Sequence, residues 1–159
     1  AATETVTLFV RAGTEHVLDE LERAVQDGID AVVAAIDKGG VVPGAGCTEA
    51  KLSDAIRSAA AGVEGRKQLA VEAYADALDS LPRTLAENTG MDPIDALVDL
   101  RAANESGRGG IIATEDRGEI QDPVEHGVID PTAVKREILQ SATEAATMIV
   151  RIDDVISAE

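Results

Sequence analysis

Gly44, Ala45 and Gly46 form a glycine-rich turn immediately before a predicted helix. Glycine lets the backbone approach a bound molecule closely, and the free N–H groups at a helix N-terminus attract anions. The turn is not a Walker A phosphate loop, because no Gly-Lys-Ser/Thr sequence follows it. Most turns of this composition bind nothing, so the local sequence leaves open a plain turn or an anion-binding site.

Aspartates near predicted helix starts are the next candidates for chemistry. Asp19 lies in the first predicted helix, where an acid can complement the helix dipole or simply face solvent. Asp92 and Asp130 each precede a proline, which is the pattern of an N-cap followed by proline at the first helical position. Capping explains both residues, so neither requires a catalytic role on local grounds.

Few side chains could bind a metal or form a covalent intermediate. Cys47 is the single cysteine, and no neighbouring base would activate its thiol, so we expect a small buried side chain. His16 and His126 are the two histidines and lie far apart in the chain, which argues against a histidine-based metal site. We therefore predict no metal site.

Five helices are predicted to position these residues. Apolar side chains recur with a 3.6-residue period between a Thr14 cap and Gly39, and later periodic segments are bounded by glycines or by Asp-Pro pairs. The later helices are expected from Thr48 until Gly62 breaks the pattern, over about 67–88, from Pro93 to the loop that begins at Ser106, and from Pro131 to Ile149. Pro82 falls inside the third helix and is expected to kink it or divide it in two.

Predicted β structure is sparse. Residues 5–11 are rich in β-branched and aromatic side chains, residues 111–121 resemble a hairpin, and residues 151–156 alternate like an edge strand. A strand is not stable alone, so the two terminal strands need a distant partner or another molecule. We therefore expect a mainly α fold with small β elements, and either missing chain or oligomerisation.

The chain is strongly acidic, and this excludes several classes of protein. Its 159 residues include 30 Asp and Glu against 14 Lys and Arg, a formal net charge of −16. Unaided nucleic-acid binding is not expected, because phosphate contacts need Lys and Arg. No apolar run approaches the roughly 20 residues that span a bilayer, and no secretory signal is recognisable. We expect a cytoplasmic protein with no membrane partner.

The acidity itself has competing explanations. Disorder does not fit a chain that is 45% hydrophobic and clearly periodic. Adaptation to high salt fits the 27 alanines, the four lysines and the two aromatic residues, because screening weakens self-repulsion and strong salting-out disfavours large apolar surfaces. The alternative is an acidic domain with a basic partner.

Five stretches together resemble the C-terminal part of a group II chaperonin subunit, the archaeal thermosome. They occur in the order of that family and cover essentially the whole chain: TLFVRAGTEHVLDELER (7–23), VVPGAGCTE (41–49), ADALDSLPRTLAENTG (75–90), DPIDALVDLR (92–101) and SATEAATMIVRIDDVI (141–156).

The resemblance implies parts of two domains. Residues 1–38 correspond to the last strand and long helix of the intermediate domain, and residues 39–159 to the C-terminal half of the equatorial, ATP-binding domain. The expected fold is thus a mainly helical equatorial half with a small β-hairpin and edge strands. The N-terminal equatorial half, with the phosphate- and magnesium-binding loop, and the apical domain are absent from this sequence, so we expect a fragment of a subunit.

The resemblance also assigns site residues. Asp19 corresponds to the intermediate-domain aspartate that positions or activates the attacking water. Gly44, Ala45 and Gly46 correspond to a turn against the ribose and base, where the family commonly has glycine in place of Ala45. Asp130 corresponds to the acid that hydrogen-bonds the ribose hydroxyls. Thr114 and Glu115 fall near the adenine-contacting hairpin, where the alignment slips by a residue.

The implied function is ATP-dependent protein folding in a double ring. The implied cofactors are ATP or ADP with Mg²⁺, whose ligands are expected mainly outside this chain, and the implied partners are other chaperonin subunits and unfolded client proteins. The 159-residue chain alone is expected to be inactive as an ATPase. The alternative is a structural or oligomerisation fragment without ATPase activity of its own.

Overall fold

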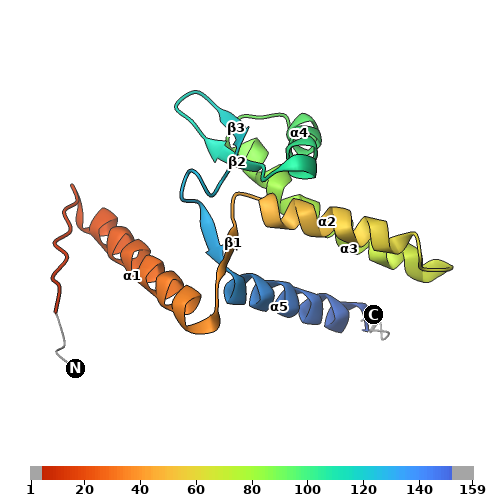
Figure 1. Cartoon of the computed structure of the whole chain (residues 1–159). Coiled ribbons are helices and arrows are strands. Elements are labelled where there is room, and N and C mark those ends of the chain that lie inside the picture. Colours follow the sequence, from red (N-terminus) through yellow and green to blue (C-terminus); the bar gives the residue numbers. More distant parts are fainter. Residues whose placement is uncertain (1–4, 152–159) are drawn as a thin grey trace, which may run out of the picture. The chain divides into compact units, whose positions relative to one another are not determined.

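The computed structural model describes residues 5–151 (Figure 1). The chain divides into two compact units, one formed by residues 1–40 and 131–159 and the other by residues 41–130. The described residues are mainly helical, with a few short strands, which confirms the predicted fold class. No described helix is long and apolar enough to cross a membrane.

Three helices build the unit of residues 41–130. They are α2 (Cys47–Ala60), α3 (Arg66–Asn88) and α4 (Pro93–Ser106), and each packs against the other two. Their buried faces consist largely of alanine and leucine, including Ala50, Ala86 and Leu100. Small side chains let the helix axes approach closely, so the core needs no aromatic residue.

Short strands complete this unit. β2 (Gly110–Ala113) and β3 (Gly118–Gln121) form the predicted antiparallel hairpin, in which Ile111 lies opposite Ile120. β1 (Val41–Pro43) pairs with β4 (Ile129–Pro131), which brings the start and the end of the unit together. This pairing places the glycine-rich turn after β1 beside the residues that lead into β4.

The helix ends follow the local signals in several places. Asp92 caps α4, since its Oδ1 accepts hydrogen bonds from the amides of Ile94 and Asp95 at 2.9 and 3.0 Å. In contrast, α3 continues as one helix through Pro82, so the expected division is wrong. Pro82 is fully buried in the helix interface, and this packing offsets the backbone hydrogen bond that proline cannot donate.

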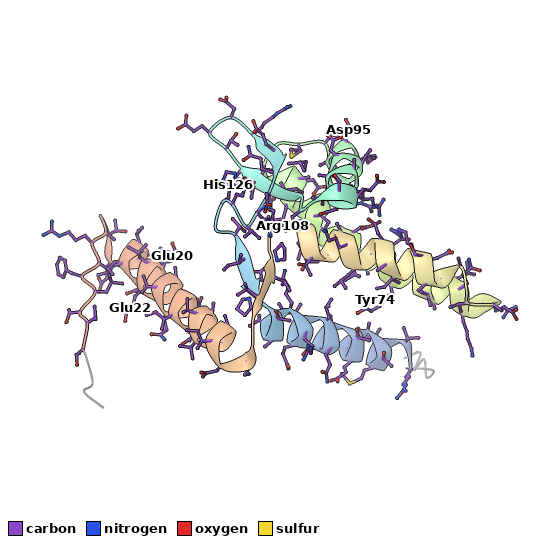
Figure 2. The ribbon with its side chains drawn as sticks, in the orientation of Figure 1. Glu20, Glu22, Tyr74, Asp95, Arg108 and His126 are labelled. Carbon is purple, nitrogen blue, oxygen red and sulfur yellow. The ribbon has the colours of Figure 1, made fainter. Side chains whose placement is uncertain are left out.

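The other unit contains two helices. α1 (Glu15–Lys38) begins at Thr14, whose hydroxyl accepts from the Val17 amide at 3.3 Å, and ends at Gly39 with φ 88°. α5 (Thr132–Val150) starts where the Thr132 amide donates to the Gly40 carbonyl at 3.0 Å. Glu20 and Glu22 project outward from α1 (Figure 2).

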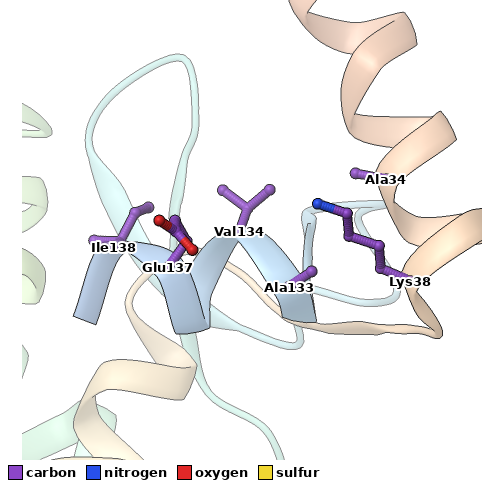
Figure 3. A pocket seen from close by; sticks show the side chains of 6 residues that line it. All are labelled: Ala34, Lys38, Ala133, Val134, Glu137 and Ile138. Atoms are coloured by element: carbon purple, nitrogen blue, oxygen red, sulfur yellow. The ribbon is translucent and has the colours of Figure 1, made fainter. Parts of the chain in front are cut away.

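An open cavity of about 220 Å³ lies between α1 and α5 (Figure 3). Four apolar side chains line it together with one cation and one anion: Ala34, Ala133, Val134, Ile138, Lys38 and Glu137. None of these lining residues belongs to the predicted site.

Two expectations about the chain ends and helix starts need correction. Residues 5–11 are irregular and form no strand, because no described segment pairs with them and a lone strand gains no ladder hydrogen bonds. The N-cap position of α5 is Pro131, without a side-chain cap, so Asp130 does not cap this helix and instead lies within β4. The strand predicted over 151–156 falls, apart from Arg151, outside the described residues.

Candidate functional site

The glycine-rich turn connects β1 to the N-terminus of α2. Ala45 and Gly46 both adopt positive φ, at 55° and 78°, which is unusual for an alanine. The Cys47 amide donates to the Gly44 carbonyl at 3.0 Å and closes the turn. The Thr48 hydroxyl donates to the Pro43 carbonyl at 2.6 Å, so the first turn of α2 fixes the end of β1.

Two neighbouring segments support the turn from outside. The Gly44 amide donates to the Val128 carbonyl at 3.0 Å, and the Ala45 carbonyl accepts from the Ile111 amide at 2.9 Å. Gly110 leaves no room for a side chain here, because a Cβ at this position would lie 2.9 Å from the Ala45 Cβ. The turn is therefore held at consecutive residues by segments more than 60 positions away in sequence.

Asp130 lies directly beside Gly44. A Cβ at position 44 would lie 3.0 Å from Asp130 Oδ2 and 3.1 Å from Val128 Cγ1. Glycine at this position thus leaves a half-buried carboxylate next to bare backbone. A carboxylate in such a place can accept hydrogen bonds from hydroxyl groups of a ligand that lies along the turn.

The start of α2 has no side-chain cap, because Gly46 occupies the N-cap position. The buried carboxylate of Glu49 lies in the first turn and complements the helix dipole there. Cys47 is fully buried, as predicted, and its Sγ donates to Asn104 Oδ1 at 3.3 Å. Burial raises the pKa of this thiol, so it stays protonated and is not a nucleophile.

An ion pair fastens the hairpin that supports the turn. Arg108, before β2, donates to Asp122, after β3, with Nε at 3.0 Å and Nη2 at 2.9 Å from Oδ2 (Arg108 is labelled in Figure 2). Loss of water contact acts to raise the pKa of Asp122, but the Val124 amide and the Arg108 guanidinium outweigh this, and the pKa lies below its ordinary value.

The structure brings together only part of the predicted set. Gly44, Ala45 and Gly46 are consecutive, and Asp130 lies beside Gly44 in the unit of residues 41–130. Asp19 is exposed on α1 in the other unit.

Thr114 and Glu115 lie beyond the end of β2 opposite to the glycine-rich turn. Both are exposed at the hairpin tip, where the Thr114 hydroxyl donates to the Arg117 carbonyl at 2.6 Å.

Three residues of this site were not recognised from the sequence. Val128 and Ile111 bind the turn through their backbones, and Pro82 of α3 packs beneath Gly46, whose added Cβ would lie 3.0 Å from Pro82 Cβ. A hydrogen bond between backbone atoms does not depend on the type of side chain, so the sequence carried no signal for Val128 or Ile111. A proline tolerated inside a long helical pattern was the available signal for the third.

No group of three or more His, Cys, Asp or Glu side chains among residues 5–151 has an arrangement that could hold a metal ion. Beside the turn, the Asp130 carboxylate is a possible hydrogen-bond acceptor for a polar ligand.

The whole sequence, residues 1–159, matches the model of the TCP-1/cpn60 chaperonin family. Thermosome subunit 3 of Haloferax volcanii is 74% identical over 160 residues, which cover all of this chain and 30% of that protein. A thermosome subunit of Methanopyrus kandleri is 56% identical over 155 residues, covering 96% of this chain and 28% of that protein.

A solved structure agrees with these similarities. It is described as the open-state monomer of a group II chaperonin from Methanococcoides burtonii, and it superimposes with a TM-score of 0.74 and 42% identity. The match covers 88% of this chain and 35% of that chain. The sequence thus spans about 30% of the length of the curated relatives it matches.

Proposed function

The chain belongs to the TCP-1/cpn60 chaperonin family, and from this premise we propose that it forms part of an ATP-dependent group II chaperonin subunit. In this proposal the subunit assembles with other subunits in a double ring in the cytoplasm and folds client proteins, with ATP binding and hydrolysis driving ring closure. The observation that carries the proposal is the cradle formed by Gly44 and Asp130 at the uncapped start of α2.

The residues present fit one end of a nucleotide. Bare backbone at Gly44 lets a ribose or a base lie close to the chain, and Asp130 Oδ2 can accept hydrogen bonds from the ribose hydroxyls. Bound Mg²⁺ would neutralise phosphate charge, and its ligands are expected mainly outside this chain. This part of the chain therefore orients the nucleoside, and Asp19 acts on the attacking water.

The proposal is tested by nucleotide binding to the intact subunit. We expect Asp130→Ala to weaken ADP binding about 10- to 100-fold, because hydrogen bonds to a charged group contribute about 1.5–3 kcal/mol each. Asp99→Ala, at an exposed position of α4 outside the predicted site, is the matched control and should bind ADP normally. Calorimetric titration gives both dissociation constants. Equal affinities in the two folded variants would exclude Asp130 from nucleoside recognition, and no ADP binding by the unaltered subunit would refute the proposed function.

The acidic composition predicts a second, independent property. The net charge of −16 and the similarity to a Haloferax subunit support adaptation to high salt. Raising KCl from about 0.1 M to about 2 M shortens the Debye length from about 10 Å to a few Å and removes most carboxylate repulsion. We expect the thermal unfolding midpoint to rise steeply over this range. A midpoint that does not change with KCl would contradict the halophilic interpretation.

A further inference from the structure

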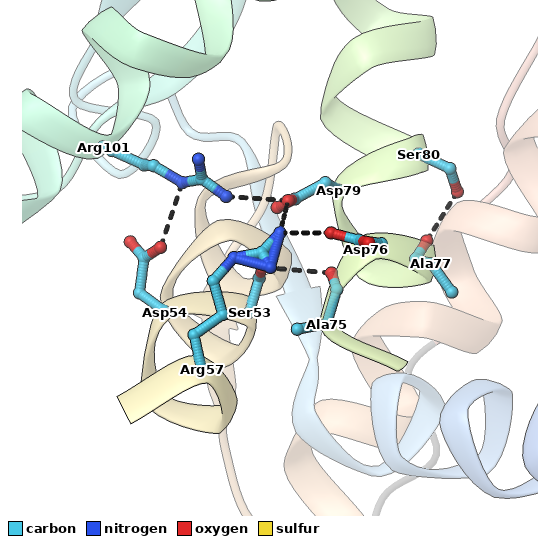
Figure 4. Close-up of polar contacts among 9 residues, drawn as sticks. All are labelled: Ser53, Asp54, Arg57, Ala75, Asp76, Ala77, Asp79, Ser80 and Arg101. Carbon is cyan, nitrogen blue, oxygen red and sulfur yellow. Dashed lines mark hydrogen bonds and ion pairs between the residues drawn. The ribbon is translucent and has the colours of Figure 1, made fainter. Parts of the chain in front are cut away.

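A cluster of five charged side chains joins the three helices of the unit of residues 41–130 (Figure 4). Its centre is Asp79 of α3, whose carboxylate is completely buried. Asp79 Oδ2 accepts from Arg101 Nη2 of α4 at 2.7 Å and also from Arg57 of α2. Two outer carboxylates complete the cluster: Arg57 Nη2 lies 2.8 Å from Asp76 Oδ1, and Arg101 Nε lies 3.0 Å from Asp54 Oδ1.

The five charges are not equivalent. Asp76 is 67% exposed, so solvent and salt screen its contact with Arg57. Asp79 has no exposure, and salt screens a buried charge far less. Its second oxygen, Oδ1, has no hydrogen-bond partner among the described residues, so the two arginines at Oδ2 provide its compensation. Removing the charge from Asp79 therefore disturbs all three helices, whereas removing it from Asp76 disturbs one surface contact.

The face of α3 that carries Asp79 also contacts the glycine-rich turn. Ala75, Asp79, Pro82 and Ala86 are buried members of this face, spaced three or four residues apart. The Ser53 hydroxyl of α2 donates to the Ala75 carbonyl at 3.1 Å, and Pro82 packs on Gly46 at the start of α2. Hence α2 lies along this face, held near its middle by Ser53 and Arg57 and at its N-terminus by contact with Pro82.

Gly46 packs closely on Pro82. A Cβ at position 46 would lie 3.0 Å from Pro82 Cβ, and Pro82 is fully buried within the continuous helix α3. A shift of α2 along α3 would therefore move Gly46 off Pro82 and move the amides at the helix start with it. Two polar contacts further along α2 determine its register along α3: the Ser53 hydroxyl with the Ala75 carbonyl, and the Arg57 guanidinium with the buried Asp79 carboxylate.

We propose that Asp79 is a positioning residue for the Gly44–Gly46 turn, acting through Arg57 and the register of α2 against α3. This rests on the proposed function for its effect on nucleotide binding, but its structural part does not. Asp79 itself touches no ligand in this proposal. Its effect should therefore appear in the affinity for nucleotide and not in the rate of the chemical step.

The first test measures amide hydrogen exchange in Asp79→Asn of the intact subunit without nucleotide, by mass spectrometry in high salt. Asparagine keeps the shape but loses the charge that holds both arginines. We expect peptides covering residues 44–52 to exchange at least 10-fold faster, while residues 114–121, the part of the β2–β3 hairpin with no hydrogen bond to the turn, are unchanged. Uniformly faster exchange across the unit would overturn the proposal, because it would indicate a general loss of stability. Unchanged exchange at 44–52 would also overturn it.

Matched variants sharpen this test. Asp76→Asn removes a charge from the same arginine and the same helix but from an exposed position, and should exchange like the unaltered protein. If Asp79→Asn fails to fold, Arg101→Lys takes its place, since lysine keeps the positive charge but cannot contact Asp54 and Asp79 with two nitrogens at once. Arg101→Lys should also speed exchange at residues 44–52, by a smaller factor than Asp79→Asn. An exchange pattern identical to that of Asp76→Asn would refute the proposal.

The second test separates this inference from the proposed function. In steady-state ATP hydrolysis, Asp79→Asn should raise KM about 10-fold and leave kcat within about twofold, because about 1.4 kcal/mol of binding corresponds to tenfold in affinity. Absence of ATP binding in the unaltered subunit would refute the proposed function and leave the exchange experiment to decide the positioning role. Normal KM in Asp79→Asn with normal hydrolysis in the unaltered subunit would refute the positioning role alone.

Discussion

Replacing Asp19 by alanine is expected to leave ATP binding within about twofold and to lower kcat for hydrolysis at least 100-fold in the intact subunit. A positioned carboxylate that orients water or accepts its proton contributes about 10²–10⁴ in rate. Asp19 is exposed on α1 and belongs to no described ion pair, so its removal costs the fold little. The loss should therefore fall on the chemical step and not on folding or nucleotide affinity.

Single-turnover hydrolysis with preformed ATP complexes measures this rate separately from binding. Glu20→Ala is the matched control: it removes the neighbouring exposed carboxylate, whose described partner is His16 at 3.9 Å, and should hydrolyse ATP normally. The 159-residue chain alone should show no hydrolysis, because it provides only part of the proposed site. Normal turnover by Asp19→Ala would remove this residue from the water-activating role.

Replacing Gly46 by alanine is expected to lower the free energy of unfolding by about 2–5 kcal/mol. Two costs add at this position. An L side chain at φ 78° costs about 1–2 kcal/mol. The new Cβ would also lie 3.0 Å from the buried Pro82 ring, and overpacking of this kind costs about 1–3 kcal/mol.

Gly90 provides the control that separates these two costs. Its φ is 73°, nearly that of Gly46, but a Cβ at position 90 meets nothing within 4 Å. Gly90→Ala should therefore lose only the conformational part, and the difference between the two variants in urea titrations measures the contact with Pro82. Equal losses would show that Pro82 does not constrain the turn. Since Gly46 starts α2, we also expect its alanine variant to bind nucleotide more weakly than Gly90→Ala.

Much of the secondary structure could be predicted because its determinants are local. Thr14 and Gly39 bound α1 as expected, and Asp92 caps α4 through amides two and three residues away. The hairpin of β2 and β3 likewise depends on residues within one short segment. Helix caps, helical periodicity and hairpin turns depend on residues that are close together in the sequence. The local order of residue types is therefore sufficient to predict them.

Predictions failed where the outcome depends on distant residues, either because a required partner is not described or because a distant contact outweighs the local signal. Residues 5–11 have the composition of a strand but no described partner, and Asp130 has the composition of an N-cap but lies in β4 beside Gly44. Pro82 carries a helix-breaking signal, yet α3 continues through it because the residue is buried against α2.

The sequence by itself determined the helices, the acidic surface charge and the presence of a glycine-rich turn, because each follows from the types of neighbouring residues. Tertiary structure alone decided that this turn is held by Ile111 and Val128, that Pro82 lies beneath Gly46, and that Asp79 joins three helices. These contacts link residues 22 or more positions apart in sequence, as between Arg57 and Asp79. Close packing and the burial of charge, which act across the folded chain, select them.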